Sequence, residues 1–412
     1  MTEAALFDRE MLAQLMPFDP FDPEFVSDPY PTYRRMRENG PVLRTPVGMV
    51  FVTGHEEASR VLRDPAFGWG DGDLVADQFV PNPDGPPLRP LMFLDPPDHT
   101  RIRSLVGRAF SGRAMERIRH RAEAIVERLV AEAVELGRHG PVDLVTAVAH
   151  PLQALVLGEL MGVGKEHYPR FRGWAADSAR GLDPIWLLSP EEVRRRDEAR
   201  AGFRAHFAEL VEARRAAPAD DLVSQLVVAQ HNGDRLTDLE LVTTCATLLA
   251  AGYGTTVNLV AGGMLALLRN PDQLAWLRAH PDRVPDAVEE LIRYDSPIQV
   301  TSRVALRETR LGDLTLVPGE PMFVLIGAAN RDPAAYPDPD RLDLSRPSTR
   351  NLGFGHGIHF CIGAPMARIT ARAAFAALIR LDVTLASEDI RYAPGLVVRG
   401  PAELPVHLRE AR

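Results

Sequence analysis

The spacing of apolar side chains predicts that the middle of the chain is mostly helical. Apolar residues recur there at intervals of three and four positions, which is the repeat of helices that bury one face. The segments with this repeat are residues 99–110, 114–136, 151–163, 191–215, 272–280 and 286–294, a long uncharged segment at 241–268, and a last helix at 365–381.

Shorter runs of apolar and β-branched residues predict strands on both sides of the helical region. Two short helices, residues 33–39 and 56–62, accompany the N-terminal strands. Residues 68–90 are rich in Gly, Pro and Asp without a repeat, so we expect a long loop of the kind that carries function. The expected strands are residues 41–46 and 48–54, joined by a Pro-Val-Gly turn, and later residues 298–306, 309–316 and 321–330.

No internal repeat and no linker-like stretch divides the 412 residues. The sequence therefore predicts a single domain over residues 1–412 that is mainly α with small β-sheets (α+β). We expect its N-terminal segment, residues 1–20, to be flexible.

Composition narrows the classes of function. The formal net charge is −9, whereas a nucleic-acid-binding domain normally carries a basic surface, so we expect no nucleic acid partner. Cys245 and Cys361 lie far apart, which disfavours a disulfide framework and a Cys-rich zinc site. The N-terminus has early acidic residues and no signal-peptide pattern, so we expect a cytoplasmic protein.

Residues 241–268 contain no charged side chain and are long enough to cross a bilayer. They also contain several threonines, Asn258 and a cluster of glycines, which lipid-facing helices disfavour at their centre. The mixture favours a buried core helix over a membrane span, and we expect no membrane association.

A glycine-rich stretch surrounds Cys361. It reads Phe-Gly-His-Gly-Ile-His-Phe-Cys-Ile-Gly over residues 354–363. Glycines let a backbone approach a flat ligand closely. Backbone N–H groups and the N-terminus of the following helix are expected to lower the pKa of a thiol placed there. These residues alone leave two interpretations open, a metal ligand or a structural cysteine in a glycine-rich turn.

The spacing Phe-x-x-Gly-x-His-x-Cys-x-Gly resembles the haem-binding loop of bacterial soluble cytochromes P450 at every defining position. The likeness extends from about residue 22 to the C-terminus. It implies the P450 fold around haem b (iron protoporphyrin IX), with Cys361 as the iron ligand. It also implies that Phe354, Gly355 and Gly363 belong to the haem-binding loop.

Two other constellations follow the family order. Glu290 and Arg293 lie three apart on one helix face, where they can pair. By resemblance, an arginine from a later loop, best matched by Arg341, joins them to support the cysteine loop. The haem carboxylates need cationic or hydrogen-bonding partners. By resemblance these partners are His99, Arg103, Arg303 and His359.

The stretch Ala-Gly-Tyr-Gly-Thr-Thr, residues 251–256, resembles the oxygen-activating helix of the family. The resemblance implies that Ala251 and Gly252 border the haem and that Thr255 helps deliver protons for O–O cleavage. The acid that usually precedes this threonine is replaced by Gly254. We expect water, Thr256 or a substrate hydroxyl to substitute for it. Peroxide-driven oxidation or oxidative coupling is the alternative.

By resemblance, the substrate pocket is built from residues 68–90, residues 173–188, the uncharged segment and the start of the later strands. No basic cluster is evident that would bind a carboxylate or phosphate. We predict a bulky, mostly apolar molecule of secondary metabolism that is hydroxylated or epoxidised with O2 as cosubstrate. The expected wall residues are Trp69, Trp186, Thr244, Thr247, Leu248, Ile298 and Val300.

The resemblance implies that electrons come from NAD(P)H through an external ferredoxin reductase and ferredoxin, because the chain has no flavin or iron–sulfur segment. Arg101, Arg108, Arg113 and Arg117 are the expected ferredoxin face, although a solvated charged face explains them equally well. We expect a monomer. A haem-binding sensor and a haem-free helper protein are the alternatives without catalysis, and the presence of Cys361 disfavours the helper.

Overall fold

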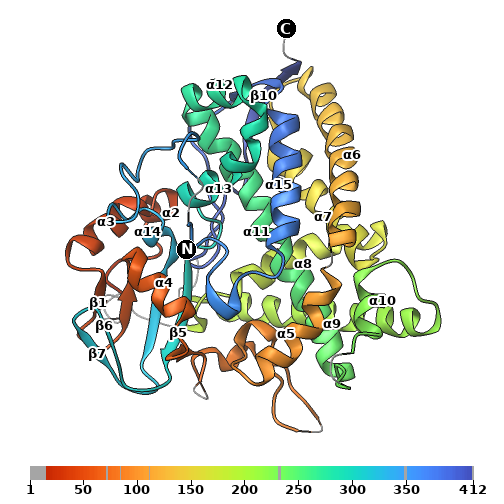
Figure 1. The fold of residues 1–412 in the computed structure, drawn as a ribbon. Helices are drawn as coiled ribbons and strands as arrows, with labels where there is room; N and C mark the ends of the chain where they lie inside the picture. Colours follow the sequence, from red (N-terminus) through yellow and green to blue (C-terminus); the bar gives the residue numbers. More distant parts are fainter. Residues whose placement is uncertain are drawn as a thin grey trace.

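The computed structural model describes residues 15–410 except 71–72, 84, 111, 231–232 and 348–349 (Figure 1). Helices make up one side of the molecule, and the main sheet with the N-terminal helices makes up the other. The helices are α2 Pro23–Ser27, α3 Tyr30–Glu38, α4 His55–Arg63, α5 Asp98–Ala109, α6 Gly112–Gly137, α7 His150–Met161, α8 Tyr168–Arg180, α9 Pro190–Ala216, α10 Leu222–Val227, α11 Asp238–Arg269, α12 Pro271–Ala279, α13 Val284–Tyr294, α14 Ile326–Ala329 and α15 Ala364–Leu378.

Three small sheets accompany the helices. The main sheet has the strand order β1-β2-β8-β5-β3, with β2 and β8 parallel and its other pairs antiparallel. A three-stranded sheet has the order β4-β10-β9, and β6 pairs with β7 in a hairpin. The strands are β1 Val42–Arg44, β2 Val50–Val52, β3 Phe67–Gly68, β4 Val142–Asp143, β5 Val300–Ala305, β6 Thr309–Leu311, β7 Leu314–Leu316, β8 Pro321–Leu325, β9 Leu381–Leu385 and β10 Pro405–Glu410.

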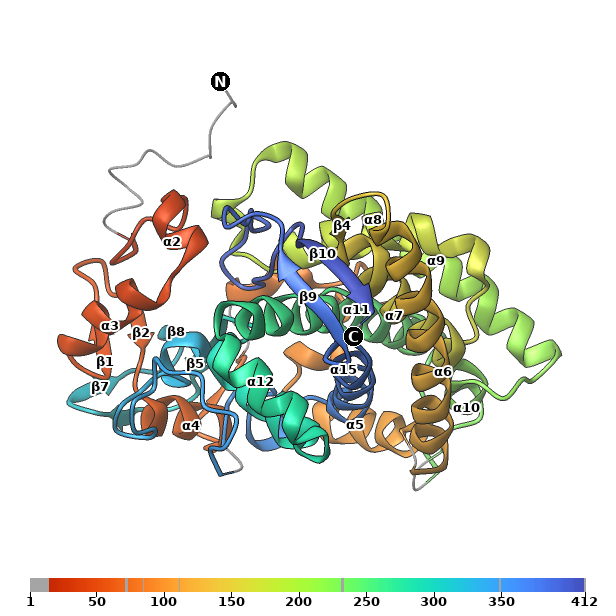
Figure 2. The ribbon, with the colours of Figure 1, turned by 90° about the horizontal axis from the view of Figure 1, so that it is seen from above.

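The long uncharged segment forms α11, which runs through the middle of the helical side (Figure 2). Thr237 caps its N-terminus in a reciprocal pair with Glu240, which satisfies backbone donors that a helix start otherwise leaves free. Within the described residues it is the one helix long and apolar enough to cross a bilayer, yet most of it is buried against α7, α8, α9, α13 and α15. It is a core helix of the fold, as the sequence predicted.

Several boundaries differ from the sequence-based prediction. The expected strand 321–330 ends at Leu325, because the chain turns into α14 there, and the expected helix 365–381 ends at Leu378 before β9 begins. Helix α8 was not predicted, since Pro169 and Gly173 interrupt its apolar pattern.

The expected flexible segment 1–20 lies mostly outside the described residues. Its described end is packed: Met16 is buried, and the ring of Phe18 stacks on Phe25 with centroids 4.5 Å apart. Leu15, Met16 and Phe18 thus join the core beside the main sheet, and the flexibility of the segment stays a prediction.

Candidate active site

Cys361 lies in a tight loop just before α15. Its N–H donates to the carbonyl oxygen of Phe354 over 2.8 Å, and the N–H of Phe360 donates to the carbonyl oxygen of Gly357 over 3.1 Å. These bonds close the loop on itself. The Cys361 side chain faces a large internal cavity, where it is accessible although protein surrounds it.

Two glycines give the loop its shape. Gly355 and Gly357 have φ values of +72° and +70°, in the left-handed region that favours glycine. A Cβ at position 357 would lie 2.6 Å from the carbonyl oxygen of Leu62 and 2.7 Å from the Cα of Arg63, both in α4. The loop therefore rests directly on the backbone of α4, which only glycine permits.

The environment of Cys361 combines opposing effects. Burial raises the pKa of its thiol, whereas the N–H groups of Gly363 and Ala364 and the guanidinium of Arg103 lower it. The donors that the sequence predicted are present. They lower the pKa as predicted, and desolvation by burial outweighs them in the free thiol. A metal ion bound to sulfur displaces the thiol proton.

A cluster of donors lies at one edge of the same cavity. The guanidinium of Arg303 lies 4.6 Å above the ring of Trp69, and the rings of His99 and His359 are 4.3 Å apart. Both ring nitrogens of His99, Nε2 of His359 and Nε1 of Trp69 are buried without a hydrogen-bond partner in the described part of the chain. Arg103 donates to the carbonyl oxygen of Phe360 over 2.5 Å.

This cluster is electropositive. Burial, followed by the charge of Arg303, lowers the pKa of His359 to about 3, and burial with the charge of Arg103 lowers that of His99. Burial also lowers the pKa of Arg303 to about 10. Buried donors without acceptors cost free energy, and the two carboxylates at a porphyrin edge would satisfy them. The residues present therefore fit haem, the group that the sequence implied.

The cavity above Cys361 has a volume of about 820 Å³. Its wall includes all of the predicted substrate residues, Trp69, Trp186, Thr244, Thr247, Leu248, Ile298 and Val300. It also includes Ala251, Gly252, Thr255, Thr256, Phe354, Gly355 and Gly363. Trp69 differs from the other wall residues, because its ring stacks with Arg303 in the donor cluster and its N–H lacks an acceptor.

Helix α11 passes over the cavity at residues 251–256. The hydroxyl of Thr255 donates to the carbonyl oxygen of Ala251 over 2.9 Å, so its lone pairs remain available toward the cavity. Nε2 of Gln153, on α7, donates to the carbonyl oxygen of Gly252 over 2.7 Å. Sequence reasoning missed Gln153, although a buried glutamine within an otherwise apolar helix is a signal that could have indicated it.

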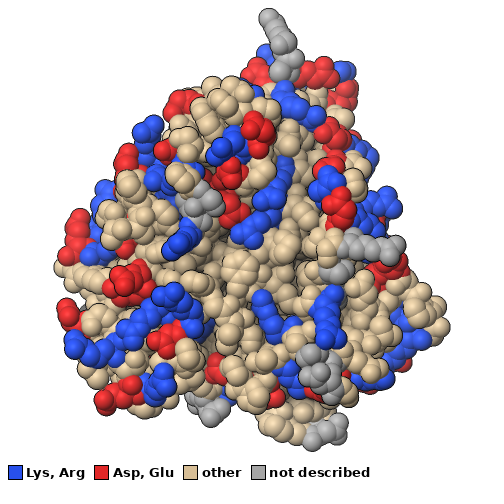
Figure 3. Space-filling model, viewed as in Figure 1, with Lys and Arg blue, Asp and Glu red and all other residues tan. Residues whose placement is uncertain are grey.

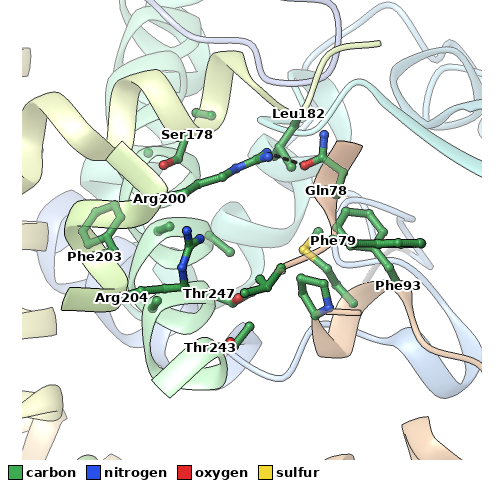
Figure 4. Close-up of a pocket in the computed structure, with 18 of the residues that line it drawn as sticks. Gln78, Phe79, Phe93, Ser178, Leu182, Arg200, Phe203, Arg204, Thr243 and Thr247 are labelled. Carbon is green, nitrogen blue, oxygen red and sulfur yellow. Dashed lines mark hydrogen bonds between the residues drawn. The ribbon is translucent and has the colours of Figure 1, made fainter. Parts of the chain in front are cut away.

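Gly254 does not line the main cavity. It lines a smaller chamber of about 110 Å³ that shares Thr247, Ala251 and Thr255 with the main cavity as part of its wall (Figure 4). The expectation of no basic cluster was wrong, because Arg200 and Arg204 of α9 both line this chamber. They lie on the charged helix 190–216, whose inward face the sequence pattern did not reveal.

Behind the cysteine loop, Glu290 and Arg293 form a buried pair. Nε and Nη2 of Arg293 donate to the carboxylate over 2.7 and 2.8 Å, and the two side chains are 2% and 0% exposed. The guanidinium of Arg346, not that of Arg341, reaches Glu290, at 3.3 Å. Arg341 contributes its carbonyl oxygen, which accepts from Arg293 over 3.1 Å. Turns in this loop set which arginine points inward, and periodicity carries no information about them.

Comparison with known proteins agrees with this geometry. The family model described as Cytochrome P450 matches residues 36–389. Cytochrome P450 monooxygenase PikC of Streptomyces venezuelae is 37% identical over 94% of this chain and 93% of its own. The 6-deoxyerythronolide B hydroxylase of Saccharopolyspora erythraea is 36% identical over 93% of this chain and 97% of its own.

Solved structures show the same fold. Ligand-free CYP164A2 of Mycobacterium smegmatis superposes with a TM-score of 0.85 at 36% identity, covering 97% of this chain and 100% of that one. Sequence and fold thus agree with those of relatives along nearly the whole length. The chain belongs to the cytochrome P450 family and is a monooxygenase with a haem-thiolate centre.

Proposed function

We propose that this protein inserts one oxygen atom from O2 into a bulky, mostly apolar small molecule of secondary metabolism, by hydroxylation or epoxidation. The observation that carries the proposal is that Cys361, the donor cluster and Thr255 all line one cavity of about 820 Å³. The two relatives described above support the substrate class, since one of them is named as the hydroxylase of 6-deoxyerythronolide B.

The residues around the cavity have distinct roles in this proposal. When bound, haem with a thiolate ligand supplies the activation of dioxygen. Cys361 provides the ligand, and His99, Arg103, Arg303 and His359 hold the carboxylate edge. Trp69 joins these four through its buried N–H.

Thr255 handles protons on the opposite side of the cavity. Because its hydroxyl donates to the carbonyl oxygen of Ala251, its oxygen accepts a hydrogen bond from water or a substrate hydroxyl on the cavity side and so holds that proton donor in place. Thr256 is buried nearby and lines the same wall. Glu290 and Arg293 act only through the position of the cysteine loop.

The test uses the purified holoprotein. We expect the reduced, carbon-monoxide-treated protein to show the Soret band of a thiolate-ligated haem. We also expect 6-deoxyerythronolide B or a related macrolactone to shift the spin state and to be oxidised. The same band without turnover of any macrolactone would support a haem-binding sensor instead, and absence of haem would support a helper protein.

Gly254 favours a second candidate, oxidation driven by peroxide or oxidative coupling. Gly254 directly precedes Thr255, at the position where the family usually carries an acid. Turnover with hydrogen peroxide is compared with turnover by NAD(P)H, ferredoxin reductase and ferredoxin. Faster product formation from peroxide would favour this candidate, and product from the reductase chain alone would exclude it.

The electron donor is proposed to be a ferredoxin that docks on the face carrying the cysteine loop. This face has an uncharged centre with basic side chains on either side of it (Figure 3). Ile358 and Phe360 of the loop are 50% and 38% exposed. Arg63, which borders the loop through Gly357, is also exposed. An acidic partner with a small apolar centre complements such a surface.

The arginines expected on this face are less available than the sequence suggested. Arg101 pairs with Glu240 and Asp234, and Arg117 pairs with Asp220. Arg108 donates to a backbone carbonyl, and the side chain of Arg113 lies outside the described residues. We therefore expect Arg63→Glu to slow reduction by ferredoxin more than Arg117→Glu does, and the gap to shrink at high salt.

We further propose that the protein acts as a single-domain monomer in the cytoplasm. The largest hydrophobic cluster runs from Leu94 to Leu408, and two smaller clusters pack N-terminal side chains against residues from 300 onward, which supports one domain. Sedimentation at micromolar concentration tests the monomer.

A further inference from the structure

The small chamber beside α11 has a mostly apolar wall that also contains polar side chains without a hydrogen-bond partner among the described residues. We call it the distal chamber; its wall comes from α8, α9, α11 and residues 78–80, and it contains no residue of the cysteine loop. Figure 4 shows Arg200 and Arg204 extending from α9 over this space, with Ser178 and Thr243 at its sides.

The two arginines lack carboxylate partners. Arg200 donates to Gln78 and to the carbonyl oxygens of Gly181 and Asp77, at 3.1 and 3.2 Å, all of them neutral acceptors. Arg204 is partly buried and makes no hydrogen bond or ion pair with any described residue. Burial lowers the pKa of Arg200 to about 10 and also lowers that of Arg204, which is the direction for desolvated cations.

A neighbouring arginine on the same helix, Arg196, is paired with carboxylates. Arg196 pairs with Asp77 over 2.6 Å and with Asp197 over 2.8 Å. Asp197, the acid that acts on Arg204, is thus already bound by Arg196. The unbalanced positive charge on this part of α9 therefore belongs to the residues that face the chamber.

Two hydroxyl groups complete the set. Oγ of Ser178 and Oγ1 of Thr243 have no hydrogen-bond partner within the described structure, and the residues are 8% and 4% exposed. Buried polar atoms are nearly always satisfied, so atoms that are not satisfied by protein indicate a ligand or water.

No carboxylate in the walls is free to balance these cations. Among described residues, Asp77 and Asp183 are the acids that line either cavity, and Asp183 is bound by Arg180 and by two backbone N–H groups. At Gly254 an added Cβ would meet only Ala179, at 3.9 Å. The position where an acid is usual thus leaves open space in this chamber.

We infer that the distal chamber binds an anionic oxygen group, a carboxylate or a phosphate, at one end of an otherwise apolar substrate. The apolar part lies in the main cavity, and the two spaces meet at Thr247, Ala251 and Thr255. Arg204 supplies the charge, and Ser178 and Thr243 donate hydrogen bonds to the oxygens. The inference rests on the proposed function, because it names the substrate class of that site.

The test compares three ligands with the same alkyl chain on the haem-loaded protein: dodecanoate, methyl dodecanoate and dodecyl phosphate. Direct binding is measured by titration calorimetry together with the spin-state shift. We expect at least one of the two anions to bind about ten-fold more tightly than the ester, as expected for a charge-assisted hydrogen bond. The tighter anion identifies whether the group is a carboxylate or a phosphate.

Variants localise the effect. Arg204→Met is expected to remove the preference for the anion while leaving the affinity for the ester within about two-fold, and Arg204→Lys to restore most of it. Gly254→Glu is expected to weaken anion binding by placing a competing carboxylate in the chamber, and Gly254→Gln to weaken it less. Arg194→Met is the matched control, since Arg194 is exposed on the same helix and paired with Glu191 and Glu198.

The inference is overturned if neither anion binds more tightly than the ester, or if Arg204→Met weakens the anion and the ester equally. The carbon-monoxide spectrum is recorded for every variant. A normal thiolate band together with no charge preference would reject the anionic substrate and leave the proposed oxygenase intact. Loss of the band in the wild type would reject the oxygenase itself.

Discussion

The two sides of the active-site cavity are built in different ways. On the side of Cys361, one short loop carries the ligand, and backbone hydrogen bonds and the contact of Gly357 with α4 hold it. On the opposite side, α11, residues 182–186 and the long N-terminal loop supply mostly apolar side chains, and α8 and α9 line the smaller chamber beside it. A fixed cofactor constrains individual residues, whereas a substrate constrains only volume, shape and a few polar groups.

Both sides contain buried polar groups that have no partner among the described residues. At the haem edge, buried imidazole and indole nitrogens have no hydrogen-bond partner among the described residues, and a ligand would supply one. In the distal chamber, Arg204 and two hydroxyls show the same pattern beside a substrate space. Haem, the cofactor of the family, explains the unpaired groups at its edge. By the same reasoning, the unpaired groups in the distal chamber indicate a ligand there.

Replacing the iron ligand is expected to have the largest effect. We expect Cys361→Ala to abolish the thiolate band and to reduce turnover to background, because the described residues that line the cavity include no second cysteine. Carbon-monoxide spectra and product assays measure both effects. Cys245→Ala is the matched control, since Cys245 is buried in the core away from the cavity. A Cys361→Ala protein that kept the wild-type spectrum would refute the assignment of the ligand.

Removing the side chain that supports the cysteine loop from behind is expected to have the next largest effect. Arg293→Ala leaves the buried carboxylate of Glu290 without its main partner, so we expect a loss of about 3–5 kcal/mol in the free energy of unfolding. Denaturant titration of the holoprotein measures the loss.

Two further variants test whether Arg346 or Arg341 is the second arginine that supports Glu290. Arg346→Ala is expected to cost less than Arg293→Ala, because its contact with Glu290 is longer and less buried. Arg341→Ala is expected to be nearly neutral, since Arg341 contributes only its backbone carbonyl. A large loss with Arg341→Ala and none with Arg346→Ala would restore the assignment made from the sequence.

The framework behind α11 is sensitive to acid. Burial lowers the pKa of His150 to about 4, whereas an unfolded chain titrates near 6.5. Between these values the unfolded chain binds more protons, so stability is complete above about pH 6.5 and falls as the pH drops toward 4. The maximum loss from this group is about 3 kcal/mol.

His150→Gln is expected to flatten the fall in unfolding free energy between pH 6.5 and 4.5, measured in urea. His407→Gln, at an exposed site on β10, serves as the control and should leave the slope unchanged. An unaltered slope for His150→Gln would show that its ring is protonated in the folded protein.

The smallest effect concerns proton delivery by α11. Thr255→Ala removes the hydroxyl that lies between Ala251 and the cavity, and we expect roughly ten-fold less product per electron consumed. Thr255→Ser keeps a hydroxyl and should retain most of the coupling. If Gly254→Glu leaves the product yield per electron unchanged, the missing acid causes no defect in proton delivery.

The cysteine side could be predicted from the sequence in its main features, because Cys361, His359 and the glycines match the spacing of a family loop that one cofactor constrains. The distal side could not. Arg204 belongs to a charged helix whose hydrophilic pattern looks solvated, and only the packing of α9 over α11 turns it inward. Arg346 was missed for a related reason, since turns rather than a repeat decide its direction.

The contact between the cysteine loop and α4 has a consequence for biosynthesis. The loop carries the ligand near the end of the chain, yet it rests on a helix made among the first 63 residues. Almost the entire polypeptide must therefore leave the ribosome before the protein can bind haem through Cys361. The haem absorption of a preparation is thus expected to come only from chains that were translated past Cys361.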